Sequence, residues 1–336
     1  MIFVTGGTGM LGAHLLFELV QVNPIIRATK RASSDLNATK KIFSFYTNKS
    51  DELFDKIEWV DVDLLEYYSI QGALDGVTKV YHCAAMISFN KKDRKKMIEN
   101  NVTGTANLVN ACLNNNIQKL IHVSSIAALG RAKIGEMTTE KTPWKDNNKD
   151  SPYSFSKYQS ELEVWRGIAE GLNAVIINPS VILGPGDWTK GSPSFFRLID
   201  KGMKYYSEGM NGYVYVRDVS RAMIQLMTSD ISGERYIING EDLTYLELFN
   251  MMAKTLGKEY PRIEAKKWMM DIAWRGAWLK GFFTGRTPEF TKSNAKSFLS
   301  SYNYSNEKLV NEIGFEYTSL QKTISSIGDI YLHDNR

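Results

Sequence analysis

Two side chains with acid and base chemistry stand four positions apart in the sequence YSFSK, residues 153–157. At that spacing Tyr153 and Lys157 share one face of a helix, with Cβ atoms roughly 5–6 Å apart. A phenol ordinarily ionises at a pKa of about 10, and a nearby ammonium group favours the ionised form. The pair therefore has the chemistry of a proton donor and acceptor. Such a pair also occurs on ordinary helix surfaces without any catalytic role. The rest of the chain must therefore show whether this pair belongs to an active site or to a plain helix surface.

A glycine-rich turn near the start of the chain predicts a phosphate-binding loop. The sequence VTGGTGMLG spaces its glycines as G-x-x-G-x-x-G, after an apolar run and before a helix-like stretch. Glycines let the backbone approach a pyrophosphate, whose charge is favoured at the positive end of a helix. The same pattern also serves tight helix–strand packing, but its position between strand and helix is the one that a dinucleotide site requires. The expected cofactor contacts here are Gly6, Thr8, Gly9, Met10, Leu11 and Gly12.

A basic turn, RATKR at residues 27–31, predicts which dinucleotide binds. It contains Arg27, Lys30 and Arg31, and no acid follows before Asp35. An acid about 20 positions beyond the glycine turn would bind the ribose 2′-hydroxyl of NAD, whereas an arginine accommodates the 2′-phosphate of NADP. We therefore expect NADP, with NAD as the alternative. Arg31 is the expected selector, with the other two cations as secondary contributors, although a solvated basic turn would have the same sequence.

The residues named so far must be positioned by the secondary structure around them. Short runs rich in β-forming residues alternate along the chain with stretches whose apolar residues have helical spacing. Apolar residues recur with helical spacing in 9–21, 64–74 and 97–115. Such alternation predicts an α/β fold of the Rossmann type, a doubly wound parallel sheet with helices on both faces. The strands are expected at residues 2–5, 25–29, 57–61, 79–83, 119–125 and 173–179.

The rhythm becomes irregular after Pro179, where a Gly/Pro-rich connection follows. We expect a dinucleotide-binding domain over residues 1–184 and a smaller C-terminal substrate-binding lobe over 185–336, with about 213–230 returning to the first domain. The polar segment 131–150 is expected to be a loop.

Composition excludes several classes of protein. Of 336 residues, 43% are hydrophobic and 23% charged, as in globular proteins, and the net charge is 41 − 37 = +4, too weak to predict a nucleic-acid partner. The two cysteines form no metal spacing, the four histidines are scattered, and no metal site is expected. With no signal-peptide pattern and no apolar run long enough to span a bilayer, a cytoplasmic protein is expected.

The segment 266–286 mixes bulky apolar residues with Lys and Arg, as an interfacial membrane helix does. A lid or packing element of the lobe is the favoured interpretation, and no membrane partner is expected.

The ordered set of motifs resembles the extended short-chain dehydrogenase/reductase family, which includes nucleotide-sugar epimerases and dehydratases. The resemblance covers most of the first 250 residues and is only loose over the last 80. The basic turn and the form HVSSIAALG are most similar to the dihydroflavonol-reductase-like branch. The motifs that carry it are TGGTGMLG, DVDL, HCAA, NVTGT, HVSSIAALG, YSFSK, NPSVILGPG, YVYVRDVSRAM and GERYIINGEDLTYLELF.

The resemblance implies further cofactor-binding residues. Asp63 and Leu64 would contact the adenine, and Ala84 and Ala85 would line the nicotinamide ribose. Asn101, counted with them, would help to order the central helix near the active site. Flanking the nicotinamide would be Pro179 and Val181.

The resemblance also implies catalytic roles. Ser125 would hydrogen-bond the substrate oxygen, and Tyr153 would be the acid and base of a hydride-transfer reaction. Lys157 would hold the ribose and favour the phenolate of Tyr153. A homodimer formed through two long helices is implied as well.

Three functions are compatible with these residues. The first is an NADP-dependent oxidoreductase that reduces a carbonyl group or oxidises a secondary alcohol of a small molecule. The second is a nucleotide-sugar epimerase or dehydratase that retains NAD, although no carboxylate follows Ser125 in the sequence IAALG as a dehydratase would require. The third is a non-catalytic cofactor-binding regulator, which the complete set of Ser125, Tyr153 and Lys157 disfavours. The substrate is not defined by the sequence, because the irregular lobe builds its pocket.

Overall fold

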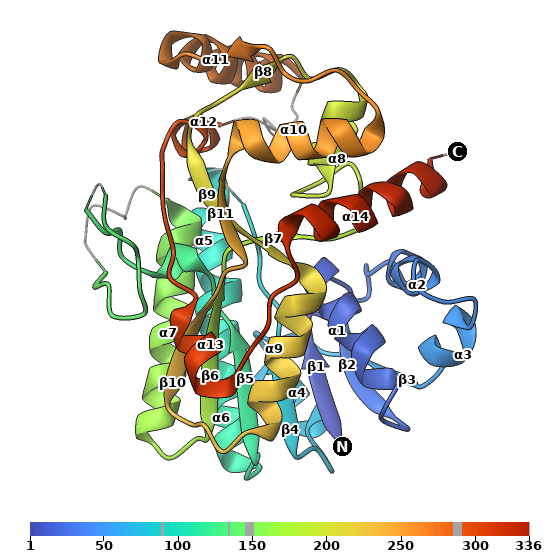
Figure 1. The fold of residues 1–336 in the computed structure, drawn as a ribbon. Helices are drawn as coiled ribbons and strands as arrows, with labels where there is room; N and C mark the ends of the chain where they lie inside the picture. Colours follow the sequence, from blue (N-terminus) through green and yellow to red (C-terminus); the bar gives the residue numbers. More distant parts are fainter. Residues whose placement is uncertain (89–90, 134, 145–150, 285–290, 336) are drawn as a thin grey trace.

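A seven-stranded parallel sheet forms the centre of the protein within the residues that the structure describes (Figure 1). The computed structural model describes residues 1–88, 91–133, 135–144, 151–284 and 291–335. Every neighbouring pair of strands in this sheet is parallel, in the order β10-β6-β5-β4-β1-β2-β3. The predicted doubly wound sheet of the Rossmann type is thereby confirmed. Its strands are β1 (Ile2–Thr5), β2 (Ile26–Lys30), β3 (Ile57–Asp61), β4 (Lys79–His82), β5 (Lys119–Val123), β6 (Ala174–Pro179) and β10 (Glu234–Ile238).

Helices cover both faces of this sheet, because adjacent residues of each strand point to opposite sides. From β1, Val4 packs in one apolar cluster with α1 (Met10–Val20), α2 (Leu36–Ser44) and α9 (Val216–Thr228). Phe3 packs in another with α4 (Tyr67–Ala73), α6 (Gly104–Asn114) and α7 (Pro152–Ala169). The short α3 (Ser50–Phe54) packs beside α2.

The helix predicted over 97–115 is interrupted. It consists of α5 (Arg94–Ile98), one π-helical turn η2 (Glu99–Thr103) and α6. Extra turns of this kind often mark functional positions in helices. Among the described residues, this half of the chain also contains the 3₁₀ turns η1 (Lys91–Asp93) and η3 (Ile126–Ala128).

A smaller lobe caps the carboxyl ends of the central strands (Figure 1). A three-stranded sheet of order β11-β9-β7 and a two-stranded pair of β12 and β8 belong to it. Its apolar core joins the three strands to α8, α10 and α14. The elements outside the central sheet are β7 (Val181–Leu183), α8 (Ser194–Asp200), β8 (Tyr205–Tyr206), β9 (Met210–Tyr215), β11 (Glu241–Thr244), α10 (Tyr245–Leu256), β12 (Ile263–Glu264), α11 (Lys267–Thr284), α12 (Lys292–Phe298), α13 (Glu307–Ile313) and α14 (Leu320–Asp334).

The chain crosses between the two parts more often than the sequence indicated. Besides α9, both β10 and α13 lie with the central sheet, α13 against β10. The division at residue 184 therefore stays a prediction, and the returning stretch extends beyond 213–230. Within the predicted loop 131–150, residues 134 and 145–150 lie outside the described residues. In the described part Thr138 forms an isolated β-bridge with Tyr304, and Glu140 accepts hydrogen bonds from Arg235 and Ile237 of β10.

Candidate active site

The glycine turn joins β1 to α1 and is packed too closely for a side chain at two positions. Gly6 has φ of +69°, and a Cβ there would lie 2.6 Å from the backbone nitrogen of Ala84. A Cβ on Gly12 would lie 2.2 Å from the carbonyl oxygen of Gly6. At Gly9 the backbone is extended, and the nearest atom to an added Cβ is 3.3 Å away. The fold thus requires two of the glycines, whereas a Cβ at Gly9 would meet one atom within 4 Å, the carbonyl oxygen of Gly6.

One cleft of about 2330 Å³ lies between the carboxyl ends of the central strands and the lobe. Typical ligand pockets have roughly 300–1,000 Å³, so this cleft has room for a dinucleotide and a second molecule. Most of the predicted site residues line it together, although they come from five separate parts of the chain. They are Gly6, Thr8, Gly9, Met10, Leu11, Gly12, Ala85, Ser125, Tyr153, Lys157, Pro179 and Val181.

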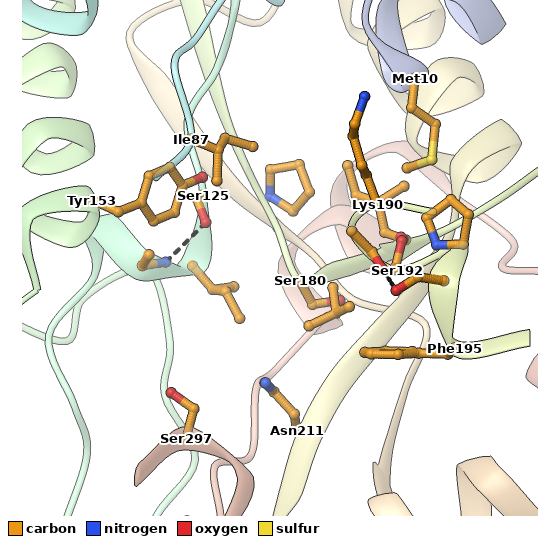
Figure 2. A pocket seen from close by; sticks show the side chains of 18 of the residues that line it. Met10, Ile87, Ser125, Tyr153, Ser180, Lys190, Ser192, Phe195, Asn211 and Ser297 are labelled. Carbon is orange, nitrogen blue, oxygen red and sulfur yellow. Dashed lines mark hydrogen bonds between the residues drawn. The ribbon is translucent and has the colours of Figure 1, made fainter. Parts of the chain in front are cut away.

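Tyr153 and Ser125 meet inside this cleft, their hydroxyl groups directed toward one another (Figure 2). Tyr153 is the second residue of α7, which begins at Pro152 after the N-cap Ser151. Ser125 follows the end of β5, and its side chain is hydrogen-bonded to Tyr153. Burial raises the pKa of Tyr153, while the hydrogen bond from Ser125 lowers it. The sequence predicts that Lys157 favours the phenolate and so lowers the pKa of Tyr153. In the structure the net change is the opposite, because burial is the largest influence and raises this pKa.

Lys157 is buried one turn after Tyr153, and its ammonium group donates to the carbonyl oxygen of Val123 at 2.8 Å. Burial lowers the pKa of this ammonium to about 8, and the charge of Glu161 acts in the opposite direction. The group is therefore mainly protonated at neutral pH but close to its titration. A lysine in this state is a hydrogen-bond donor that changes charge in the working pH range.

Glu161, one further turn along α7, is a buried carboxylate that the sequence interpretation missed. Its oxygens accept hydrogen bonds from Ser124 Oγ at 2.7 Å and from Asn178 Nδ2 at 2.9 Å. They also form an ion pair with Arg235 at 2.8 Å. Because Asn178 also donates to the carbonyl oxygen of Ser125, this network supports the segment that carries Ser125. The sequence does contain a sign of this carboxylate: Tyr153, Lys157 and Glu161 follow one another at intervals of four residues and therefore share one face of the helix.

Asn101 supports the site from the π-helical turn η2. Its side-chain amide exchanges two hydrogen bonds with the backbone of Met86, at 2.7 and 2.9 Å, and donates to Ser156 of α7 at 3.0 Å. Asn101 is buried and does not line the cleft. These bonds agree with the ordering role expected of Asn101, exerted on the segment after β4 and on α7, whereas its position outside the lining does not support a direct contact with the cofactor.

Two of the histidines, His82 and His122, lie buried side by side on the neighbouring strands β4 and β5. His82 is bonded to Thr5 and Thr105, and burial lowers its pKa to about 3. His122 lies beside it, and neither of its ring nitrogens has a partner among the described residues. Among the described residues no cluster of three possible metal ligands occurs.

The basic turn at the end of β2 lies beside the glycine turn, since Thr29 Oγ1 accepts a hydrogen bond from Gly6 N at 3.3 Å. Arg27 is directed elsewhere: its guanidinium donates to the carbonyl oxygens of Ala73 and Asp75 at 2.8 and 2.9 Å and pairs with Glu58. Its predicted secondary role in cofactor selection is therefore wrong.

Of the other two cations in the turn, Lys30 is paired with Asp61 through both carboxylate oxygens at 2.8 Å, which neutralises its charge. Its predicted secondary role is weakened accordingly. Arg31 is exposed and begins a tight turn, with its N–H bonded to Ser34 Oγ at 3.0 Å. No described residue forms an ion pair with it.

Three further predicted contacts do not line the cleft. Ala84 packs its backbone on Gly6, and its N–H donates to Thr5 Oγ1 at 3.3 Å. Asp63 and Leu64 follow β3, where Asp63 caps the N–H of Leu65 at 3.0 Å and the carbonyl of Leu64 accepts from Asn107. Their contact with an adenine ring stays a prediction.

The walls of the cleft are completed by the segment before α8 and by side chains of the lobe. The segment before α8 lies over the glycine turn, with Lys190 and Ser192 near Met10 (Figure 2). Apolar side chains of the lobe, such as Phe195 and Phe249, form the opposite wall. Asp187 is the one carboxylate among the described lining residues, and it is paired with Lys190 at 3.0 Å.

No helix within the described ranges is both long and apolar enough to cross a membrane.

Comparison with known proteins decides the family. Residues 2–239 match the model of the NAD dependent epimerase/dehydratase family. The chain belongs to this family. Membership confirms the resemblance drawn from the sequence and the predicted class of NAD(P)-dependent enzyme.

Relatives of this epimerase/dehydratase family member extend along nearly the whole chain. It is 28% identical over 322 residues to sterol demethylase protein B of Methylococcus capsulatus, covering 94% of this chain and 93% of that protein. It is 27% identical over 332 residues to a Synechocystis protein assigned as a dihydroflavonol 4-reductase, with 96% and 92% covered. The crystal structure of gox2253 superposes with a TM-score of 0.80 at 27% identity, over 100% and 99% of the two chains.

Proposed function

We propose that this protein is an NADP-dependent reductase that converts a carbonyl group of a small molecule into an alcohol, or catalyses the reverse reaction. The observation that carries the proposal is the hydrogen-bonded pair of Tyr153 and Ser125 beside Lys157, in a cleft whose other wall is the glycine turn. Ligands of open α/β sheets bind at the carboxyl ends of the strands, where these residues lie.

The residues fit a dinucleotide. The start of α1 and the open side of Gly9 offer backbone N–H groups and a positive helix end to a pyrophosphate. The nicotinamide, when bound, supplies or accepts the hydride. Pro179, the last residue of β6, and Val181, the first residue of β7, flank its expected position, and the ammonium of Lys157 donates to the ribose.

Tyr153 delivers a proton to the substrate oxygen as the hydride arrives at the carbonyl carbon. Ser125 donates a hydrogen bond to the same oxygen and holds the phenol in place. A raised pKa keeps Tyr153 protonated at neutral pH, which suits the donor role in reduction.

Arg31 binds the 2′-phosphate of NADP, because it is the cation of the basic turn that is exposed and unpaired by any described residue. A charge-assisted hydrogen bond contributes roughly 1.5–3 kcal/mol, which corresponds to about 10- to 150-fold in affinity. Exposure to salt places the expected preference for NADPH over NADH near the lower end.

An epimerase or dehydratase that retains NAD is the second candidate, and the family includes both kinds of enzyme. A dehydratase needs an acid at the substrate to eliminate water, but Asp187 is the one carboxylate among the described lining residues and is paired. The reductase is therefore favoured over a dehydratase, and a basic turn without an acid before Asp35 favours it over an epimerase that retains NAD. The complete set of Ser125, Tyr153 and Lys157 likewise disfavours a non-catalytic regulator.

Measured dissociation constants for NADPH and NADH test the proposal in the parent protein, in Arg31→Ala and in the control Arg27→Ala. We expect tighter NADPH binding in the parent and control, and loss of the preference in Arg31→Ala. Equal affinities in the parent, together with NAD that stays bound through purification, would instead assign the protein to the epimerases.

A further inference from the structure

The helix α11 is rich in large apolar side chains, and several of them are exposed to solvent. It stands at the end of the lobe farthest from the central sheet, next to β8 (Figure 1). Over residues 267–279, whose side chains the structure describes, none is fully buried. Trp268 and Ile272 are each 62% exposed, Trp278 is 56% exposed and Leu279 is 49% exposed. Large apolar groups gathered in this way on a surface mark a contact with another apolar body.

This helix is apolar on two sides. Met269, Met270 and Ala273 line the cleft on the inner side. Trp268 and Ile272 also line the cleft although each is 62% exposed, and helical spacing places Leu279 on the same face. Leu279 and Trp278 do not line the cleft. Closing α11 over a ligand in the cleft would cover the inner side and leave Trp278 and Leu279 in water.

The stretch of sequence that contains the helix is basic. Residues 262–296 contain eight Lys and Arg and three Asp and Glu, a net charge of 8 − 3 = +5. Since the whole chain carries +4, the remainder carries −1. Lys266, Lys267 and Arg275 are exposed beside the apolar residues. A partner for this face must therefore be apolar and anionic, which a second copy of the same basic segment is not.

We propose that α11 docks on the surface of an anionic lipid bilayer. Tryptophan side chains favour the headgroup level of a membrane, and Lys or Arg next to a surface helix attracts anionic lipids. The sequence interpretation favoured a lid or packing element for 266–286, of which 285 and 286 lie outside the described residues. The exposure of Trp278 and Leu279 outside the cleft is the observation that changes the assignment.

Sedimentation of the full chain with vesicles tests this proposal. We expect the protein to pellet with vesicles of phosphatidylcholine and phosphatidylserine, and much less with phosphatidylcholine alone. Added NaCl should weaken the binding because it screens the cations. Inorganic phosphate at the same ionic strength as NaCl should weaken it no more than NaCl does, because the bilayer and not a free phosphate is the partner.

Two double variants make the test specific. Trp278→Gln with Leu279→Gln should lower vesicle affinity about tenfold or more, since burying one large apolar side chain has roughly that effect. Neither residue lines the cleft. The control is Val22→Gln with Ile25→Gln, which changes residues 78% and 56% exposed beside the central sheet and should leave vesicle binding unchanged.

NADPH affinity, measured in each variant, reports that the protein is folded and is independent of the membrane. Equal binding to both kinds of vesicle, or an equal loss in the two double variants, would overturn the proposal. So would a parent protein that does not pellet. If ultracentrifugation then showed a dimer that Trp278→Gln with Leu279→Gln disrupts, the face would be an interface between two copies.

Discussion

Replacing Glu161 by glutamine should lower the pKa of Lys157 without touching the substrate or the cofactor. Burial already holds this pKa at about 8, and the carboxylate of Glu161 is the first of the influences that raise it. An opposite charge nearby typically changes a pKa by about 1–3. Arg235 pairs with the same carboxylate and partly offsets its charge. We therefore expect the pKa of Lys157 to fall by about one unit, the lower end of this range.

The expected effect then depends on pH in a defined direction. Lys157 acts as an ammonium, so its contribution is lost as the pH rises through its pKa. With the pKa at about 8 in the parent and about 7 in Glu161→Gln, the protonated fraction differs by about twofold at pH 7 and by nearly tenfold at pH 9. The alkaline limb of NADPH binding should therefore begin about one pH unit earlier in the variant.

NADPH dissociation constants measured between pH 6 and pH 9.5 give this profile without knowledge of the substrate. The variant also leaves Arg235 without its charged partner and should lose about 3 kcal/mol of stability. Asp218→Asn is the matched control. Asp218 is equally buried and binds Arg221 and Thr318, but lies on α9. An alkaline limb that does not move in Glu161→Gln, or moves equally in Asp218→Asn, would refute the reasoning.

Three other changes have distinct expected outcomes. Tyr153→Phe should abolish turnover and leave cofactor affinity nearly intact, because only the proton-donating hydroxyl is removed; retention of more than a few per cent of the rate would exclude it as the acid. Lys157→Ala should weaken both NADPH binding and turnover, so an effect on one alone would contradict the double role. Gly9→Val should fold normally yet lose dinucleotide affinity by calorimetry, whereas Gly12→Ala should also lower the unfolding temperature, because its Cβ would lie 2.2 Å from Gly6 O.

Residues at the ends of the central strands were predictable from the sequence because local patterns determine them. In a parallel sheet of this type, ligands bind at the carboxyl ends of the strands. The residues that follow a strand, such as the glycine turn after β1 and Ser125 after β5, can therefore be assigned to the ligand site from the sequence. Tyr153 and Lys157 were likewise predictable, because a helix of known start and the spacing of four residues place both on one side.

Side-chain partners from distant parts of the chain could not be predicted in this way. Arg27 was assigned to the cofactor by its charge and position in the turn, but it lies nearer the start of β2, within reach of the carbonyl groups at the end of α4. The ion pair of Glu161 joins α7 to β10, more than seventy residues later. No local pattern in a single sequence relates two such positions.

The position of β10 at the edge of the central sheet has a consequence for how the chain is made. Every residue of β6 is buried, and its outer edge is covered only by β10. During synthesis, the whole apolar strand AVIINP emerges well before its neighbour Glu234–Ile238 exists. An unpaired strand edge is a template for pairing with other chains. The nascent protein is therefore prone to aggregation until β10 has been synthesised. A chain that stops near residue 184 lacks β10, so the edge of β6 would stay unpaired and we expect such a chain to aggregate.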